Sequence, residues 1–208
     1  MNCHPRKSPF QRHARQRGAT LIEALVSILL FSIGLLGIAG LQVNALVFQK
    51  SSWATHRIAE VTNDIGERMR ANPDGVELGL YNYVQPYATA KAATISSNYC
   101  RKVVATPPTC NGLQIANDDL SEWLLKAQTV LPQGAVRLEG TAAAGYTVTV
   151  MYLDKEFTDP ANNNALLAAT TCSAASTGVA WRNCCPAAVA VPNGVKCSRS
   201  FMQPYVPE

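Results

Sequence analysis

Residues 17–41 read RGATLIEALVSILLFSIGLLGIAGL, and this stretch decides how the chain is organised. The apolar run from Ala19 to Leu41 has 23 residues, and Glu23 is its only charged one. At about 1.5 Å per residue, a helix of this length just crosses a hydrocarbon layer of roughly 30 Å. The stretch therefore predicts a transmembrane helix over residues 19–41.

A basic leader, residues 1–18, precedes this run. Its five cations, with no acid, are Arg6, Lys7, Arg12, Arg15 and Arg17, and the positive-inside rule keeps such a segment on the cytoplasmic face. In an ordinary secretory signal the small-residue cleavage site follows the apolar stretch, whereas here the sharpest junction, Gly18-Ala19, precedes it. Cleavage at that junction leaves the membrane helix on the mature chain.

Glu23 is the anomaly of the run, because a carboxylate at the centre of a spanning helix costs about 2.5 to 3.5 kcal/mol and somewhat less near its end. One interpretation is that the side chain reaches the headgroup region. The other is that Glu23 pairs with a cation of a neighbouring subunit, for which the free amine of a chain cut before Ala19 is suitable. On the second interpretation, cleavage creates an assembly contact.

Residues 17–23 resemble the prepilin processing site of type IV pilins and type II secretion pseudopilins. The resemblance implies that a prepilin peptidase cuts after Gly18, that the Ala19 amine is methylated, and that Glu23 registers incoming subunits. Ala19 departs from the Phe or Met found in many members of the family.

Without the leader, 13 basic residues stand against 14 acidic ones, so the basic character of the whole chain belongs to the leader. A mature chain this close to neutral gives no compositional argument for a nucleic-acid partner. No internal repeat is visible, and we expect no cofactor and no metal.

Six cysteines remain after Cys3 leaves with the leader, and an even number outside the cytoplasm predicts disulfides. Six cysteines allow 15 connectivities. Since adjacent cysteines rarely bond each other, we expect Cys100 to pair with Cys110, and Cys184 and Cys185 each to pair with one of Cys172 and Cys197, in either order. A four-cysteine zinc site is the alternative, although the paired C-x2-C spacing is absent.

The helix is expected to continue past the membrane, because no proline occurs between Ala19 and Pro73. A continuous helix over residues 19–72 has 54 residues and measures about 80 Å. Its second part, residues 42–72, is amphipathic, with one apolar stripe that can pack on a globular domain. The stripe residues are Val47, Ala54, Ile58, Val61, Ile65 and Met69. Asp64 and Arg68 form an i, i+4 pair typical of a solvated helical face.

Residues 73–208 are expected to form a globular periplasmic head. Residues 72–109 are rich in turn formers and predict a loop layer. Helical spacing predicts a second helix over 118–130, capped by Asn117 or Asp118, and alternation predicts two antiparallel strands over 135–139 and 146–153. A last strand is expected near 196–202. The predicted fold class is α+β and type IV pilin-like: a long N-terminal helix, membrane-spanning in its first half, packed on a small antiparallel sheet, with a disulfide-stapled C-terminal region.

Three further segments narrow the resemblance to the minor pilins of the PilV family, also called type IV pilus modification proteins. They are residues 32–37, residues 64–73, and residues 131–134 followed by 146–150. This likeness implies a scarce subunit that joins the other minor and major pilins in a complex that primes pilus assembly, with a possible tip adhesin. It further implies a single-pass inner-membrane protein with a periplasmic C-terminal domain, surrounded by membrane lipid before it enters the pilus at the cell surface.

Other classes of function have less support. The mature chain has only one histidine, His56, and neither Ser121 near Glu122 nor Asp154 near Glu156 forms a recognisable catalytic constellation, so we expect no enzyme. A type II secretion pseudopilin shares the same processing site. A membrane-anchored adhesin or DNA-uptake subunit is a third possibility, for which Arg182, Lys196 and Arg199 are the candidate phosphate-binding strip.

Overall fold

The structure, a computed structural model, describes residues 20–94, 100, 109–163 and 165–204, apart from the side chains of Val47 and Ser51. The chain divides into two compact units, residues 1–50 and 51–208. Helix α1, Leu21–Ala71, runs through the end of the first unit into the second. The continuous helix predicted from the sequence is therefore present over these residues.

The first unit, over its described residues 20–50, is helical from Leu21 onward. The carbonyl of Thr20 accepts hydrogen bonds from the N–H groups of Glu23 (3.0 Å) and Ala24 (3.2 Å), which starts the helix. Helix α1 continues without a break through its three glycines, Gly34, Gly37 and Gly40.

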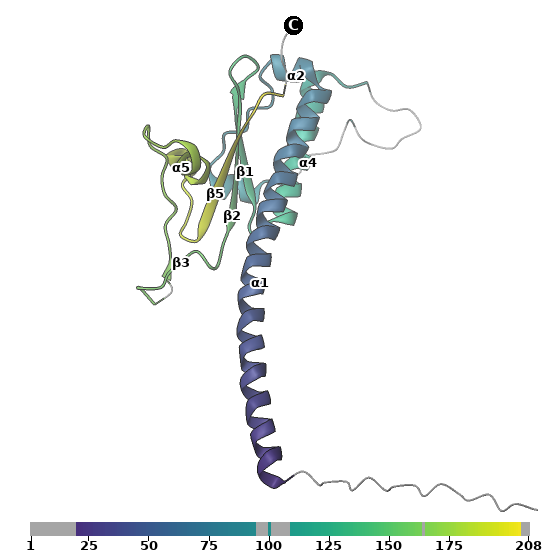
Figure 1. Cartoon of the computed structure of the whole chain (residues 1–208). Helices are drawn as coiled ribbons and strands as arrows, with labels where there is room; N and C mark the ends of the chain where they lie inside the picture. The colour runs from purple at the N-terminus through teal and green to yellow at the C-terminus, as the bar shows by residue number, and fades with distance from the viewer. Residues whose placement is uncertain (1–19, 95–99, 101–108, 164, 205–208) are drawn as a thin grey trace, which may run out of the picture. The chain divides into compact units, whose positions relative to one another are not determined.

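The second unit, here called the head, is an antiparallel sheet with a layer on each face. Strands β1 (Ala135–Thr141), β2 (Gly145–Leu153) and β5 (Val195–Met202) pair in the order β1-β2-β5. Figure 1 shows α1 and α4 (Gly112–Val130) on one side of the sheet and α5 (Gly178–Asn183) on the other. The α+β pilin-like fold is confirmed.

The core between α1, α4 and the sheet is built from the predicted stripe. Ile58, Val61, Ile65 and Met69 of α1 are all buried in it. Trp123 of α4 is fully buried in the same core, and its indole N–H donates to the carbonyl of Val61 at 2.8 Å. The strands supply the alternate residues that face the helices, including Val136, Leu138, Tyr146, Val148 and Val150.

The helix predicted over 118–130 is longer, because α4 begins six residues earlier. Its N-cap is Asn111 and not Asn117 or Asp118: the Asn111 side chain accepts from the Gln114 N–H, and the Gln114 side chain accepts from the Asn111 N–H. This capping box satisfies two helix N-terminal donors at once. Asp118 instead lies buried inside the helix, where it accepts from the Cys100 N–H at 2.7 Å.

The expected loop layer is also partly helical. Within residues 72–94, α2 (Pro73–Glu77) and α3 (Tyr87–Ala92) are short helices, and Asn72 caps α2 by accepting from the Gly75 N–H at 3.3 Å. Proline at the first position of α2 has no N–H to leave unpaired, which suits a helix start.

The opposite face of the sheet carries a second, smaller core. Met151, Val195 and Cys197 of the strands pack there with Tyr87 and Val189. Three disulfides staple the head: Cys100–Cys110, Cys172–Cys184 and Cys185–Cys197. The disulfide-stapled C-terminal region is thus present, and its two bonds follow the sequential order. A short pair of strands, β3 (Thr158–Asp159) and β4 (Ala165–Leu166), and the 3-10 helix η1 (Ala187–Val189) complete the head.

Candidate functional site

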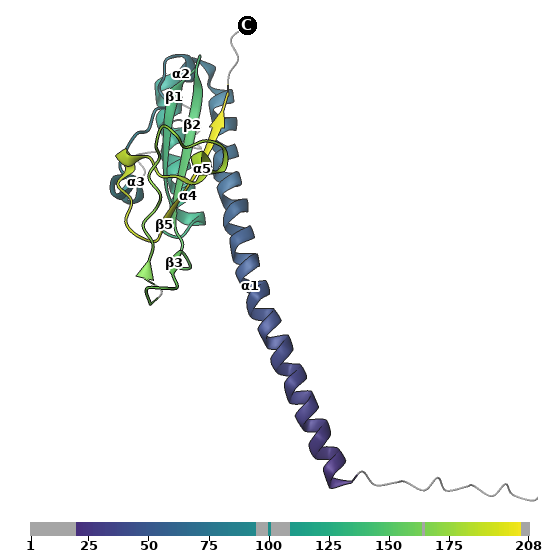
Figure 2. The ribbon, with the colours of Figure 1, turned by 60° about the vertical axis from the view of Figure 1, so that its left-hand side comes forward.

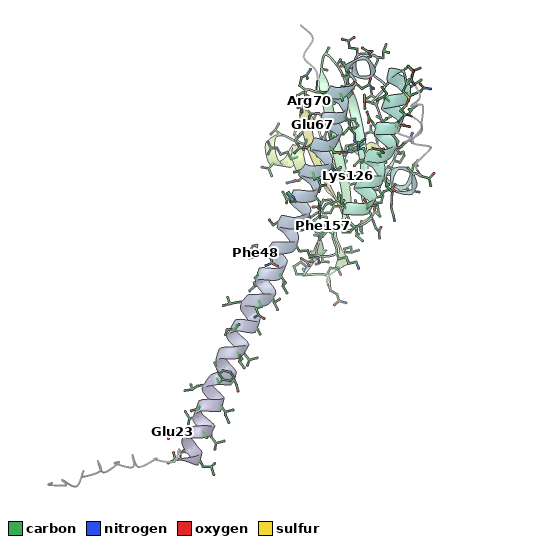
Figure 3. All side chains as sticks on the ribbon, turned by 90° about the vertical axis from the view of Figure 1, so that its right-hand side faces the viewer. Glu23, Phe48, Glu67, Arg70, Lys126 and Phe157 are labelled. Carbon is green, nitrogen blue, oxygen red and sulfur yellow. A yellow bond between two sulfur atoms is a disulfide. The ribbon has the colours of Figure 1, made fainter. Side chains whose placement is uncertain are left out.

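The start of α1 is the first candidate site. Glu23 lies in its first turn, and Figure 3 shows it near the end of the helix, with side chains projecting on every side. The hydroxyl of Ser27, one turn further on, donates to the backbone carbonyl of Glu23 at 2.7 Å and not to its carboxylate. Gly18 and Ala19, the residues of the predicted cleavage, lie outside the described residues.

No described residue reaches the Glu23 carboxylate with a cation or a hydrogen-bond donor. Because the side chain is exposed in the isolated chain, its cost arises only when the helix enters an apolar medium. The compensating cation must then come from outside the described part of the chain. This geometry is compatible with the pairing interpretation of Glu23, whose role stays a prediction.

The side chains around Glu23 are apolar on all faces of the helix. Every described side chain from Thr20 to Lys50 is exposed, and the large apolar ones include Leu21 (80% exposed), Phe31 (68%) and Phe48 (76%). A helix that is apolar all round needs an apolar surrounding, which is lipid or other helices. Among the described residues, α1 is the one helix long and apolar enough to cross a membrane.

The C-terminal end of α1 carries a polar network that the sequence did not reveal. Arg68 contacts three carboxylates: Asp64 at 2.8 Å, Glu122 at 2.8 Å and Asp119 at 3.3 Å. The Tyr81 hydroxyl donates to Asp119 at 2.6 Å. The interpretation of Asp64 and Arg68 as a solvated pair is therefore wrong in part, because both side chains are only about one-fifth exposed and both bind α4, Asp64 through Lys126 at 3.3 Å.

Burial, followed by the hydrogen bond to Asp119, raises the pKa of Tyr81 above its usual value. The phenol therefore stays protonated and remains a donor throughout the physiological range. The network fixes the register of α1 against α4 and contains no activated nucleophile or base, so we interpret it as structural.

Of the three cations proposed as a phosphate-binding strip, Arg182 and Arg199 line one hollow and Lys196 lines a second. Lys196 is paired with Asp154 at 2.9 Å and lies 4.9 Å from the centre of the Phe157 ring. The Arg199 guanidinium lies 4.3 Å from the Trp181 ring centre, and burial lowers its pKa. Lys196 is thus already neutralised, which weakens the strip hypothesis.

The remaining polar candidates serve local structure. The Ser121 hydroxyl donates to the Asn117 carbonyl at 2.8 Å, and Asp154 accepts from the Glu156 N–H at 3.0 Å. His56 is exposed on α1. All six mature cysteines are in disulfides, so the four-cysteine zinc alternative is wrong.

Comparison with known families supports the first site. The family model of the prokaryotic N-terminal methylation motif matches residues 13–39, the end of the leader and most of the apolar run. No curated protein and no solved structure matches the chain. The prepilin-type motif and the exposed apolar helix support a protein of the type IV pilin-like class, which includes pseudopilins. Such a motif implies processing by a prepilin peptidase, assembly with other pilins, and membrane anchoring with the C-terminal domain outside the cytoplasm.

Proposed function

We propose that this chain is a minor pilin of the type IV pilus, of the PilV kind, that takes part in the initiation of pilus assembly and in motility and adhesion. It acts as a structural subunit and not as an enzyme. The observation that carries the proposal is the exposed Glu23 carboxylate in the otherwise apolar run of residues 19–41, within the residues that match the methylation motif. The PilV assignment rests further on the likeness to that family of residues 32–37, residues 64–73, and residues 131–134 followed by 146–150.

The proposed sequence of events follows from the charges. A prepilin peptidase cuts between Gly18 and Ala19, which removes the five leader cations and frees an amine. In the bilayer, Glu23 stays close to the headgroups. When the helix moves into a filament, the Ala19 amine of an adjoining subunit neutralises the carboxylate, so that the contact forms only in correct register.

The direct test is the mass of the mature amino terminus together with incorporation of Glu23 variants. We expect a chain that starts at methylated Ala19, and we expect Glu23→Ala to be processed and inserted normally but absent from sheared filaments. Glu77→Ala is the matched control, because Glu77 is an exposed acid of the head, and it should enter filaments at the normal level. An intact leader, or normal incorporation of Glu23→Ala, contradicts the proposal.

The pseudopilin alternative shares the motif and the acidic residue, so deletion phenotypes must separate the two. Loss of twitching motility with protein secretion intact supports the pilus. Loss of secretion with motility intact supports a type II secretion pseudopilin, with the same processing chemistry.

A further inference from the structure

Strand β5 is an edge strand whose outer side has no partner among the described residues. The direction of its backbone groups follows from the register of the sheet. Leu138 of β1 exchanges two hydrogen bonds with Tyr83, at 2.8 and 2.9 Å, on the side away from β2. Its antiparallel partner Val148 therefore directs its backbone groups away from β1, toward Ser200 of β5.

Because backbone groups alternate sides along a strand, the neighbours of Ser200 point the other way. The N–H and C=O groups of Arg199 and Phe201 are directed away from β2, and no described residue bonds them. An edge of this kind is a template for another strand.

A groove runs along this open edge. Its volume is about 640 Å³, and we call it the edge groove: α1 residues 55–70 form one wall, α5 residues 181–183 form the other, and residues 198–202 of β5 lie between them. A second hollow of about 400 Å³ continues it along β5 to Lys196. Figure 2 shows β5 as the strand of the sheet that lies beside α1.

The edge groove exists because small side chains face each other across it. Ser198 and Ser200 share the helix-facing side of the sheet with Val148 and Val150. On α1 the opposite wall includes Gly66, where an added Cβ meets only the flexible end of Met202, at 3.7 Å. Serines and a glycine cannot fill the space that the valines fill elsewhere in the core.

Two polar atoms of the groove residues are buried without a partner in the described part of the chain. They are Oγ1 of Thr62 on the α1 wall and Nε of Arg199 at the edge of β5. A buried polar atom without a hydrogen bond loses its bonds to water and gains none in return. The orphaned atoms on both sides thus favour a polar occupant over an apolar one.

The charged side chains of the groove indicate the charge that its occupant should carry. Of its cations, Arg70 is paired with Glu67 at 2.5 Å, whereas Arg182 is exposed and has no ion pair among the described residues. The Arg199 guanidinium is held over the Trp181 ring and contacts sulfur atoms, not a carboxylate. The α5 side of the groove is therefore positive.

We propose that the edge groove binds an extended, acidic segment of another polypeptide, which adds to the sheet as a fourth strand beside β5. Backbone hydrogen bonds to Arg199 and Phe201 supply the pairing. Residues of the added strand that face α1 must be small, because they lie against Gly66 and Thr62. Alternate residues face α5, where aspartate or glutamate meets Arg182 and Arg199. The site needs only the folded head and is independent of the processing of Ala19 and of Glu23.

The test uses the full mature chain in detergent micelles and a fluorescein-labelled nine-residue peptide in which Glu and Thr alternate. We expect saturable binding by fluorescence anisotropy. A peptide with Lys in place of Glu should bind at least about tenfold more weakly, and so should a Glu-Thr peptide that is N-methylated on alternate backbone nitrogens.

The paired variants Phe201→Pro and Phe201→Ala separate the backbone from the side chain. Both lose the ring, but only proline removes the outward N–H, and proline is tolerated at an edge strand on its unpaired side. We expect Phe201→Pro to bind the peptide about tenfold more weakly than Phe201→Ala, with both variants melting as folded proteins.

Equal affinity of the two variants, equal binding of the Glu and Lys peptides, or no binding at millimolar peptide overturns the proposal. A different outcome is that the protein self-associates, with the peptide displacing that association and Phe201→Pro abolishing it. Such a result assigns the groove to a second copy of this chain and also overturns the proposal. None of these outcomes depends on whether the protein enters a pilus.

Discussion

Replacing Tyr81 with phenylalanine removes one oxygen atom from the network between α1 and α4. The Tyr81 hydroxyl donates to Asp119 at 2.6 Å and accepts from the Asn72 amide at 3.1 Å. The Asp119 side chain is only 3% exposed, so water cannot readily replace the lost donor. The aromatic ring, which is fully buried, keeps its packing in the variant.

The expected loss follows from these two bonds. A hydrogen bond to a charged group contributes about 1.5 to 3 kcal/mol, and a neutral one about 0.5 to 1.5 kcal/mol. Asn72 keeps its bond to the Gly112 carbonyl at 3.0 Å, so its share of the loss is small. Tyr81→Phe should therefore lower the free energy of unfolding of the head by about 2 to 4 kcal/mol.

Urea unfolding of the mature chain in detergent micelles, followed by tryptophan fluorescence, measures this difference. Tyr146→Phe is the matched control, because its equally buried hydroxyl donates at 3.2 Å to the neutral Val76 carbonyl. That variant should lose about 0.5 to 1.5 kcal/mol. If Tyr81→Phe lost no more than Tyr146→Phe, the carboxylate would not be the dominant partner and the reasoning would be refuted.

Alkaline pH should also destabilise the head: burial, followed by a carboxylate hydrogen bond, raises the pKa of Tyr81 above 10.0, so the unfolded chain releases the proton first. The contribution of Tyr81 to stability is then fully present below about pH 10 and is lost as the pH rises through the raised pKa. The urea midpoint should therefore fall less steeply with pH in Tyr81→Phe. Gly145→Ala should cost about 1 to 3 kcal/mol in the same urea assay, because Gly145 has φ +81° and a Cβ there would lie 2.3 Å from Phe201. Serine at both Cys185 and Cys197 should lower stability by about 2 to 4 kcal/mol, visible as an earlier thermal transition, and an unchanged transition would show that the bond adds nothing.

The long helix and its buried stripe could be predicted because both depend on the local sequence pattern, that is, on residues close together in the chain. Ile58, Val61, Ile65 and Met69 repeat every three or four residues, and all four are buried. The start of α4 was mispredicted although Asn111 and Gln114 have capping-box spacing. Gly112 lowers helix propensity at that point, and Asn117 offered a more obvious cap.

The two candidate sites differ in how far the sequence alone identifies them. Glu23 stands out from its own neighbours, since a charge in an apolar run needs no knowledge of the fold to be noticed. The edge groove depends on which residues of α1 lie opposite Ser198 and Ser200, and on which side of β5 the Arg199 backbone points. Both are long-range properties of register, and a one-residue shift of β5 would exchange its two faces.

The two surfaces need partners of opposite chemistry, so mutations can test each surface separately. The first half of α1 exposes apolar side chains and one carboxylate, so its partners must be lipid or apolar helices that bring a cation. The β5 edge exposes backbone hydrogen-bonding groups and arginines beside small side chains, so an apolar helix cannot satisfy it. A change at Glu23 should therefore leave peptide binding to the edge groove intact, and Phe201→Pro should leave processing at Ala19 intact. Coupled loss of both properties would mean that one of the two surfaces acts through the other.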